Sequence, residues 1–354
     1  MKGLILSGGK GTRLRPITFT SAKQLVPVGN KPILYYGIES LKNAGITDIG
    51  IIVGDTYKDI EDAVGDGSTW GIKVTYLRQE APLGLAHAVK ISEEFMAGED
   101  FVMYLGDNMI MSGVDEFIDD FKKTKPSASI LLAHVSNPSQ FGVAELSGEK
   151  VVRLEEKPKQ PKSDLALVGV YLFSKDIFKA VNSIKPSKRN ELEITDAIQW
   201  LIENKFSVHS TIIKGWWKDT GKLEDMLEAN RMVLDNIETA IKGIVSQDSE
   251  IHGRVVIEDG AEIKNSIIRG PVVIGKNTRI ENSYIGPYTS ISSSCVVTGS
   301  EIEHSIILEN SVITSIESRI EGSLLGRNVK IEKSLNKPRS NRFMVGDNSE
   351  IIIL

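Results

Sequence analysis

The chain has 354 residues, of which 41% are hydrophobic and 25% are charged, and its formal net charge is −5. At about 150 residues per domain, this length predicts two or three domains with well-formed cores. The small negative charge excludes the bulk attraction on which general nucleic-acid and anionic-lipid binders depend. We therefore expect neither nucleic acid nor a membrane as a partner.

The sequence also predicts where the protein works. A single cysteine, Cys295, cannot form an internal disulfide, so nothing requires an oxidising compartment. No stretch approaches the roughly 18 uninterrupted apolar residues of a membrane span, and the apolar run at residues 1–7 lacks a signal-peptide cleavage site. We expect a cytoplasmic protein.

The first part of the chain alternates short apolar runs with amphipathic stretches, which is typical of βαβ units. Strands are predicted at residues 2–6, 48–53, 74–77, 101–105, 129–134 and 166–173, and helices at residues 32–44, 84–95 and 193–205. This order predicts a doubly wound, Rossmann-like α/β domain. Such sheets bind their ligands beyond the carboxyl ends of their strands.

The composition changes near residue 243. Residues 244–354 contain 20 isoleucines, whereas the 243 residues before them contain 23, and 19 of the 22 aromatic residues fall in that first part. We therefore expect one domain at residues 1–243, including a connecting helix at about residues 221–242 with its clearest pattern at 223–233. A second domain is expected at residues 244–354.

The second part repeats the motif Ile-x-x-Ser, which starts at Ile263, Ile280, Ile302, Ile320 and Ile331. An apolar position about every six residues, with Gly, Asn or Ser between, predicts a parallel β-helix whose three faces make coils of about 16 to 18 residues. The intervals that begin at Ile263 and Ile302 match one such coil. The longer interval from Ile280 to Ile302 would then contain an insertion. A β-sandwich of short strands is the alternative, but its turns space isoleucines less evenly.

A glycine-rich loop, Gly8-Gly9-Lys10-Gly11-Thr12-Arg13, directly follows the first predicted strand. Free backbone amides and nearby cations at such a position can hold phosphate groups. The spacing matches neither a Walker loop nor a dinucleotide-binding loop, so kinase-like and dehydrogenase interpretations lose support. A glycine turn beside solvated cations is the alternative for the loop alone.

Further motifs follow in an order that identifies a family. They are Gly8-Gly9-Lys10-Gly11-Thr12-Arg13-Leu14-Arg15-Pro16, Ala22-Lys23-Gln24-Leu25-Val26-Pro27-Val28, Lys31-Pro32-Ile33, Gln79 before Pro82-Leu83-Gly84-Leu85-Ala86, Leu105-Gly106-Asp107-Asn108, Phe141-Gly142-Val143, Leu154-Glu155-Glu156-Lys157-Pro158, Val168-Gly169-Val170-Tyr171, Glu191-Leu192-Glu193-Ile194-Thr195-Asp196 and Trp217-Lys218-Asp219-Thr220-Gly221. This series resembles the sugar nucleotidylyltransferases, also called NDP-sugar pyrophosphorylases. It is most similar to members that transfer a thymidylyl group to glucose 1-phosphate, in the long form with a C-terminal left-handed β-helix.

The resemblance implies an enzyme that joins a nucleoside triphosphate to a sugar 1-phosphate and releases pyrophosphate. It assigns catalytic roles to Arg13, Lys23 and Lys157, nucleotide binding to Leu6, Gly8, Gly9, Gly11, Thr12, Gln79 and Gly84, sugar binding to Asn108, Gly142, Glu156 and Val168, and Mg²⁺ binding to Asp107 and Asp219. Two anionic substrates repel each other, so cations must neutralise their phosphates and align an in-line attack on the α-phosphate. The resemblance therefore agrees with the charges in the motifs.

Alternatives of the same fold remain open. The enzyme could use UTP or N-acetylglucosamine 1-phosphate, or the chain could be a non-enzymatic regulatory subunit of similar structure. An added acetyl transfer in the β-helix would need a histidine base, and His252 and His304 are each more typical of structural or solvated residues. We expect the β-helix to assemble a homo-oligomer instead, since flat stacked faces pack well in symmetric assemblies.

Overall fold

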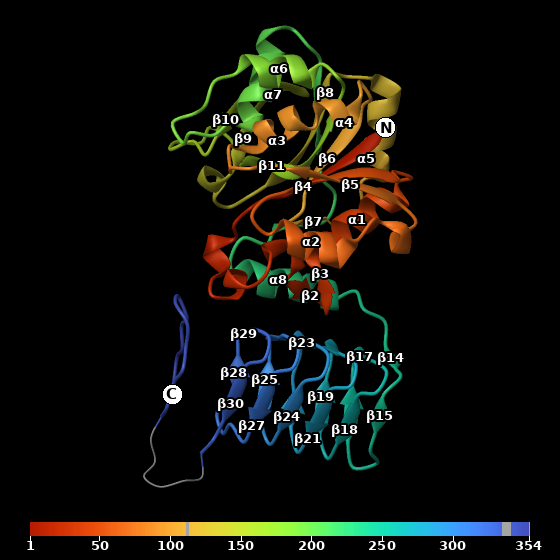
Figure 1. Ribbon diagram of the computed structural model, residues 1–354, viewed down its shortest axis with the longest axis vertical. Helices are drawn as coiled ribbons and strands as arrows, with labels where there is room; N and C mark the ends of the chain where they lie inside the picture. Colours follow the sequence, from red (N-terminus) through yellow and green to blue (C-terminus); the bar gives the residue numbers. More distant parts are fainter. Residues whose placement is uncertain (111–112, 335–340, 354) are drawn as a thin grey trace. The chain divides into compact units, whose positions relative to one another are not determined.

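The computed structural model describes residues 1–110, 113–334 and 341–353, in two compact units (Figure 1). The first unit contains Met1–Lys10, Ser21–Leu25 and Ile33–Asp219, and the second contains Gly11–Thr20, Val26–Pro32 and Thr220–Leu354. The domain division expected near residue 243 stays a prediction. Among the helices of the described ranges, none is long and apolar enough to cross a membrane.

The first unit is built on one large mixed sheet. Its centre is parallel in the order β5-β4-β1-β6, and the antiparallel strand β11 follows beside β6. The strands are β1 (Lys2–Ser7), β4 (Asp48–Val53), β5 (Lys73–Arg78), β6 (Phe101–Leu105), β8 (Ala128–His134), β9 (Gly142–Ser147), β10 (Lys150–Glu156), β11 (Leu165–Phe173) and β12 (Val208–Ile212). The chain leaves β1 toward β4 on one side and returns to β6 on the other, so the order reverses between β1 and β6. The predicted doubly wound fold is confirmed.

Helices cover both faces of this sheet. Buried apolar residues of α3 (Leu85–Ile91), α4 (Glu93–Met96), α6 (Ile177–Ser183) and α7 (Ile194–Glu203) join one core cluster, and those of α1 (Ile33–Asn43), α2 (Tyr57–Val64) and α5 (Asp115–Thr124) join another. The predicted helix at residues 84–95 is in fact two helices. It breaks at buried Ser92, whose hydroxyl donates to the carbonyl of Val89 at 2.7 Å and competes with the helical pattern.

Short elements complete the first unit. The antiparallel pair β7 (Asn108–Ile110) and β13 (Trp217–Asp219) aligns Asn108 with Asp219. The 3-10 helices along the chain are η1 (Thr12–Leu14), η2 (Ile17–Phe19), η3 (Lys23–Leu25), η4 (Ser68–Trp70) and η5 (Pro138–Gln140), of which η1 and η2 belong to the second unit.

The second unit contains stacked short strands in three parallel sheets, as Figure 1 shows. The first sheet contains β14 (Ala240–Ile241), β17 (Val255–Ile257), β20 (Val272–Ile274), β23 (Thr289–Ile291), β26 (Ile306–Ile307) and β29 (Leu324–Leu325). The second contains β15 (Ile244–Val245), β18 (Glu262–Lys264), β21 (Arg279–Glu281), β24 (Val296–Thr298), β27 (Val312–Thr314) and β30 (Lys330–Glu332). The third contains β16 (Glu250–His252), β19 (Ile267–Arg269), β22 (Tyr284–Ile285), β25 (Glu301–Glu303) and β28 (Ile320–Glu321). This is the parallel β-helix that the repeat predicts, and it is consistent with the left-handed form that the family resemblance implies.

The rungs confirm the predicted coil length but correct one interval. Ile263 pairs with Ile280 in the second sheet, whereas Ile302 pairs with Ile285 in the third sheet. The longer interval between Ile280 and Ile302 therefore contains no insertion, because the motif moves from one face to the next. Stacked isoleucines fill the core, and most of them are fully buried.

A helix and a hairpin pack on this β-helix within the second unit. The helix is α8 (Leu223–Leu234), and the hairpin joins β2 (Pro27–Val28) to β3 (Lys31–Pro32). Asn230 of α8 is fully buried and accepts hydrogen bonds from the Gly29 amide at 2.8 Å and the Ser290 hydroxyl at 2.7 Å. Its amide donates to the carbonyl of Tyr288 at 3.0 Å, so one side chain links helix, hairpin and β-helix.

Candidate active site

The predicted site lies at the point where the sheet order reverses. Leu6 of β1 is aligned with Leu105 of β6, so the loops after these strands begin at the same sheet edge. Gly8 follows β1, and Asp107 follows β6. A Cβ atom on Gly8 would lie 3.3 Å from the Gln79 Oε1 atom, so glycine leaves room beside that side chain. Gly9 continues the loop and is exposed.

Lys23 brings the two predicted metal ligands together. Its side chain is buried on η3, and its Nζ atom donates a short hydrogen bond to Asp107 Oδ2. The same Nζ atom lies 4.0 Å from Asp219 Oδ1. The β7–β13 pairing explains this meeting, since it aligns Asn108 with Asp219 although the two are far apart along the chain.

The charges around Asp107 keep it ionised. Burial alone would raise the pKa of this carboxyl group, but the Lys23 charge and hydrogen bonds from Lys23 and Asn108 lower it below its ordinary value. Two carboxylates beside one cation are hard oxygen donors of the kind that Mg²⁺ prefers. Within the described ranges no group of three or more His, Cys, Asp or Glu residues could hold a metal ion. A metal here would take its other ligands from phosphate and water.

Gln79 has a fixed orientation. Its Nε2 atom donates to the Gly84 carbonyl at 3.2 Å and lies 3.0 Å from Nδ1 of His87, which leaves Oε1 on the side of Gly8. Gly84 has a φ of +101°, and a Cβ there would come within 2.4 Å of the Leu192 carbonyl oxygen, so only glycine fits. His87 was not predicted from the sequence, where its signal is its place just after the motif that contains Gly84.

Burial, together with the charge of Lys90, lowers the pKa of His87 below its ordinary value of 6.5. A neutral His87 can accept through Nδ1, which is the role that the Gln79 amide requires. The pair therefore presents a carbonyl oxygen of defined position at the sheet edge.

A second group of predicted residues meets across β9 and β10. The register aligns Gly142 with Glu156, and a Cβ on Gly142 would lie 3.1 Å from Glu156 Oε2. The Nζ atom of Lys157 is 3.8 Å from Glu156 Oε1, and the guanidinium of Arg189 is 3.4 Å from the same oxygen. Burial and the charge of Glu193 raise the pKa of Glu156, while Lys157 and Arg189 oppose that shift.

Arg189 was not predicted from the sequence. It forms ion pairs with Glu156, with Glu191 at 3.1 Å and with Glu193 at 3.5 Å, so it holds the acidic side of this group together. Its sequence signal was its position just before the Glu191-Leu192-Glu193 motif.

Asn108 lies beside β11, the strand that contains Val168. Asn108 is buried, and its Oδ1 atom accepts from the Trp217 indole at 2.6 Å. A Cβ on Gly169 would meet Asn108 at 2.7 Å, so the glycine permits this close contact. Val168 is fully buried in the core, so the structure shows no surface of this residue that a ligand can reach.

The predicted phosphate-binding residues Gly11, Thr12 and Arg13 belong to the second unit. Gly11 has a φ of +60° before η1, and its carbonyl accepts from the Thr18 hydroxyl at 2.7 Å. A Cβ on Gly221 would lie 2.9 Å from the Arg13 guanidinium, so Gly221 gives this cation its space. Arg13 and Thr12 are exposed.

Gln24 lies in the motif at residues 22–28, but the sequence assigned it no role. It is 2% exposed, and its Oε1 atom has no hydrogen-bond partner among the described residues. A buried polar atom in that state points to a ligand or water. Its neighbour in the motif is Lys23, which the sequence did single out.

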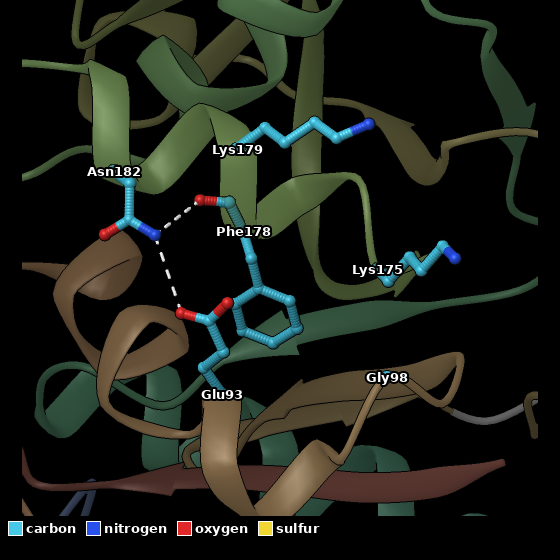
Figure 2. A pocket seen from close by; sticks show the side chains of 6 residues that line it. All are labelled: Glu93, Gly98, Lys175, Phe178, Lys179 and Asn182. Atoms are coloured by element: carbon cyan, nitrogen blue, oxygen red, sulfur yellow. Dashed lines mark hydrogen bonds between the residues drawn. The ribbon is translucent and has the colours of Figure 1, made fainter.

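A separate shallow pocket contains none of the predicted residues. It has a volume of about 350 Å³ and lies between α4 and α6 (Figure 2). Asn182 there donates to the Phe178 carbonyl at 2.8 Å and to Glu93 at 3.5 Å. The first bond lies within α6 and the second joins α6 to α4, so the pocket adds nothing to the site.

The sequence profile of the nucleotidyl transferase family matches residues 2–236. The chain therefore belongs to the nucleotidyl transferase family, and it is an enzyme of the nucleotidyltransferase class.

Relatives of known name are similar over its whole length. A glucose-1-phosphate thymidylyltransferase of Streptomyces antibioticus is 55% identical over 355 residues, which cover 100% of this chain and 99% of the relative. A solved structure from Bacillus anthracis, described as a candidate glucose-1-phosphate thymidylyltransferase with sucrose, matches with a TM-score of 0.63 and 37% identity over 68% of this chain and 97% of its own. A UDP-glucose pyrophosphorylase complexed with UDP-glucose matches with a TM-score of 0.61 and 27% identity over 67% of this chain and 99% of its own.

Proposed function

We propose that this chain is a glucose-1-phosphate thymidylyltransferase, which forms dTDP-glucose and pyrophosphate from dTTP and glucose 1-phosphate. The observation that supports this best is the 55% identity to the Streptomyces antibioticus enzyme across both full lengths. The cluster of Lys23, Asp107 and Asp219 at the sheet edge agrees with it, because this reaction needs cations and metal-binding carboxylates beside phosphates.

The reaction is an attack of a sugar phosphate oxygen on the α-phosphorus of the nucleotide, with pyrophosphate leaving in line. Lys23 and Lys157 hold the α-phosphate and the sugar phosphate and reduce their repulsion. Arg13, with the amides of the glycine loop and of Thr12, holds the triphosphate and stabilises the leaving pyrophosphate. No general base is required, because the attacking oxygen is already ionised.

We propose Mg²⁺ as the cofactor, held by Asp107 and Asp219. Bound there, Mg²⁺ supplies positive charge to the phosphates during the transfer. The lowered pKa of Asp107 keeps that carboxylate available for the ion at neutral pH. Lys23, which contacts both carboxylates, orients them before substrates arrive.

Gln79 selects the base. Its Oε1 atom lies on the Gly8 side while Nε2 is engaged by Gly84 and His87, so it presents an acceptor to the ligand. Thymine and uracil have an N3–H donor for it, whereas cytosine has a bare N3. Leu6 lies beneath the base. UTP is therefore the second candidate substrate, which the structural match to a UDP-glucose pyrophosphorylase also favours.

For the sugar, Glu156 accepts hydrogen bonds from hydroxyl groups beside Gly142, and we propose that Asn108 and Val168 complete the sugar site. Its two oxygens can serve neighbouring hydroxyls of glucose. N-acetylglucosamine 1-phosphate remains the alternative sugar substrate, since the same acceptors would suit it.

We further propose that the protein works in the cytoplasm as a homo-oligomer assembled through the β-helix, and that its domains divide near residue 243. A regulatory subunit is disfavoured because such a chain has no need of Lys23, Asp107, Lys157 and Asp219 together. An acetyl transfer in the β-helix is disfavoured because His252 is exposed and pairs with Glu250 at 2.9 Å.

The test measures pyrophosphate release with Mg²⁺ and a panel of dTTP, UTP, CTP, ATP and GTP, each with glucose 1-phosphate and with N-acetylglucosamine 1-phosphate. We expect the fastest release with dTTP and glucose 1-phosphate, and little with CTP. Release with UTP alone, or with the amino sugar alone, would move the substrate assignment but keep the mechanism. No release with any pair would overturn the proposal and favour the regulatory subunit.

A further inference from the structure

The C-terminal segment repeats the corner of the β-helix. The corners between the first and second sheets read Ile274-Gly275-Lys276-Asn277-Thr278-Arg279-Ile280, Ile307-Leu308-Glu309-Asn310-Ser311-Val312-Ile313 and Leu325-Gly326-Arg327-Asn328-Val329-Lys330-Ile331. The tail reads Val345-Gly346-Asp347-Asn348-Ser349-Glu350-Ile351, with the same spacing between its apolar ends. It therefore has the sequence of one more rung.

The tail also has the backbone shape of a corner. Asn277, Asn310 and Asn328 adopt left-handed φ values of 56°, 59° and 59°, and Asn348 adopts 62°. Yet no strand pairing joins residues 341–353 to the described rungs. Val345 and Ile351, which match core positions, are 58% and 52% exposed. The tail therefore has the backbone of a rung corner but, among the described residues, no neighbouring strand to pair with. This indicates that it is built to pack against another rung.

The β-helix has an open end that matches it. Ile307 and Ile313 are fully buried, because a rung covers each of them. Leu325 and Ile331, the equivalent residues of the last described rung, are only half-buried. Solenoids need a capping segment at such ends, since an open rung exposes both its core and its strand edges.

The charges fit this placement. Glu309 and Arg327 occupy the same corner position in successive rungs and pair at 3.3 Å. Asp347 would occupy that position in the next rung. Glu262 and Arg279 are the first residues of the stacked strands β18 and β21 in the second sheet, and their charged groups lie 3.9 Å apart. Lys330 is the first residue of β30, and Glu350 would be the equivalent residue of the added rung. Opposite charges would therefore stack there again.

The chain between Ile331 and Val345 is long enough for the tail to reach the open end of the same β-helix. In earlier coils, the step from a core residue of the second sheet to the next core residue of the first runs from Ile280 to Ile291 and from Ile313 to Leu325. The step from Ile331 to Val345 is slightly longer than either of these. The previous rung already contains extra residues between β27 and β28, so the fold tolerates longer connections at this face.

We infer that residues 343–353 dock on the open end of the same chain's β-helix as a further rung, with Val345 over Leu325 and Ile351 over Ile331. Docking in the same chain is favoured because its connecting segment keeps the tail at high local concentration. Earlier rungs show the expected backbone bonds, since Asn328 N–H donates to the Glu309 carbonyl at 3.0 Å. The Asn348 N–H would donate in the same way to the Arg327 carbonyl.

A disulfide tests the register. In adjacent parallel strands, stacked residues lie about 4.8 Å apart, which is within disulfide range. The double variant Lys330→Cys with Glu350→Cys should form an intrachain disulfide on mild oxidation, at least tenfold more completely than Lys330→Cys with Asp347→Cys. Native Cys295 is buried, and burial raises its pKa to about 11, so it should not compete.

Peptide mapping and non-reducing gels distinguish the outcomes. An intrachain bond between positions 330 and 350 supports the inference. Equal yields in the two variants would overturn it, and bonds formed only between chains would overturn docking in the same chain.

Hydrogen exchange tests the unmodified protein. The amides of residues 351–353 should exchange much more slowly than in a free peptide of the same sequence. Deleting residues 341–354 should speed exchange at Lys330 and Ile331 while leaving Ile280 protected. Free-peptide rates for the tail in the full-length protein would contradict the inference, whatever the enzyme's substrates prove to be.

Discussion

The two units use buried polar groups in opposite ways. In the first unit, irregular connections bring Lys23, Asp107 and Asp219 from three distant segments to one sheet edge. In the second unit, each rung repeats the previous one, so polar groups such as Ser266 and Ser283 contact their equivalents one rung away. A repeated contact stabilises every rung equally but collects no cluster of different groups. A cluster suited to chemistry is therefore expected at this sheet edge, and packing in the repeated rungs of the second unit, which also contains the predicted phosphate-binding residues Gly11, Thr12 and Arg13 outside its rungs.

The largest expected effect breaks the first unit's cluster. Asp107→Asn should lower kcat about a hundredfold or more and raise the Mg²⁺ concentration needed for half-maximal rate, because it removes a charged metal ligand. The measurement is pyrophosphate release across a Mg²⁺ titration.

The matched control is Asp259→Asn, which makes the same change at an exposed corner of the β-helix. It should leave both kcat and the Mg²⁺ titration unchanged. A normal titration for Asp107→Asn would remove Asp107 from the metal site, and a loss in Asp259→Asn would contradict the division of roles between the sheet-edge cluster and the rungs of the β-helix.

The second effect is on stability in the β-helix. Ile268 is fully buried in β19, whereas its neighbour Ile267 is 37% exposed. Ile268→Ala should cost about 2–5 kcal/mol through a cavity in the stacked core, while Ile267→Ala should cost less than about 0.5 kcal/mol. Urea unfolding followed by circular dichroism measures both. Equal losses would show that the repeated core is not close-packed.

A third prediction concerns the polar link inside the second unit. Asn230→Ala leaves the Gly29 amide, the Ser290 hydroxyl and the Tyr288 carbonyl without this partner. It should lower stability by about 1–3 kcal/mol. Asn236→Ala, at an exposed position just beyond the same helix, is the control and should be nearly neutral. If both variants melt like the parent, the link adds no stability.

The repeated fold was easier to predict than the site. Isoleucines recur with the rung, so the periodicity alone predicted the β-helix, and the apolar runs predicted β1, β4, β5, β6, β8 and β11. The interval before Ile302 was misinterpreted because Ile-x-x-Ser occurs on two faces of the coil. Strands β9 and β10 were missed, since exposed residues such as Arg153 interrupt their apolar pattern.

The site depended on contacts that no local pattern encodes. The motifs named Asp107 and Asp219, but the β7–β13 pairing that brings them together is a long-range feature. Arg189 and His87 were missed because their importance lies in what they touch. Arg189 lies between α6 and α7, whereas its partner Glu156 is in β10. His87 is in α3, whereas its partner Gln79 follows β5. Only the structure shows that the members of each pair are in contact. The roles of all these residues stay predictions until they are tested.

The smallest expected effect concerns the Gln79 and His87 pair. Burial and Lys90 lower the pKa of His87 below 6.5, so the folded protein binds this proton less readily than the unfolded chain does. Stability is therefore unaffected above pH 6.5 and falls as the pH drops from 6.5 through the lowered pKa. Protonation also replaces the Nδ1 acceptor by a donor that opposes the Gln79 amide.

The KM for dTTP should therefore rise about two- to tenfold as the pH falls through that window, which corresponds to the loss of one hydrogen bond. In His87→Gln the rise should be smaller, because an uncharged side chain at this position does not titrate. His134→Gln is the control, since His134 is exposed and pairs with Asp164 at 2.8 Å outside the site. The phosphates of dTTP titrate equally with all three proteins, so only a difference between His87→Gln and the other two reports on Gln79. Identical pH profiles would show that His87 does not orient the base-binding amide.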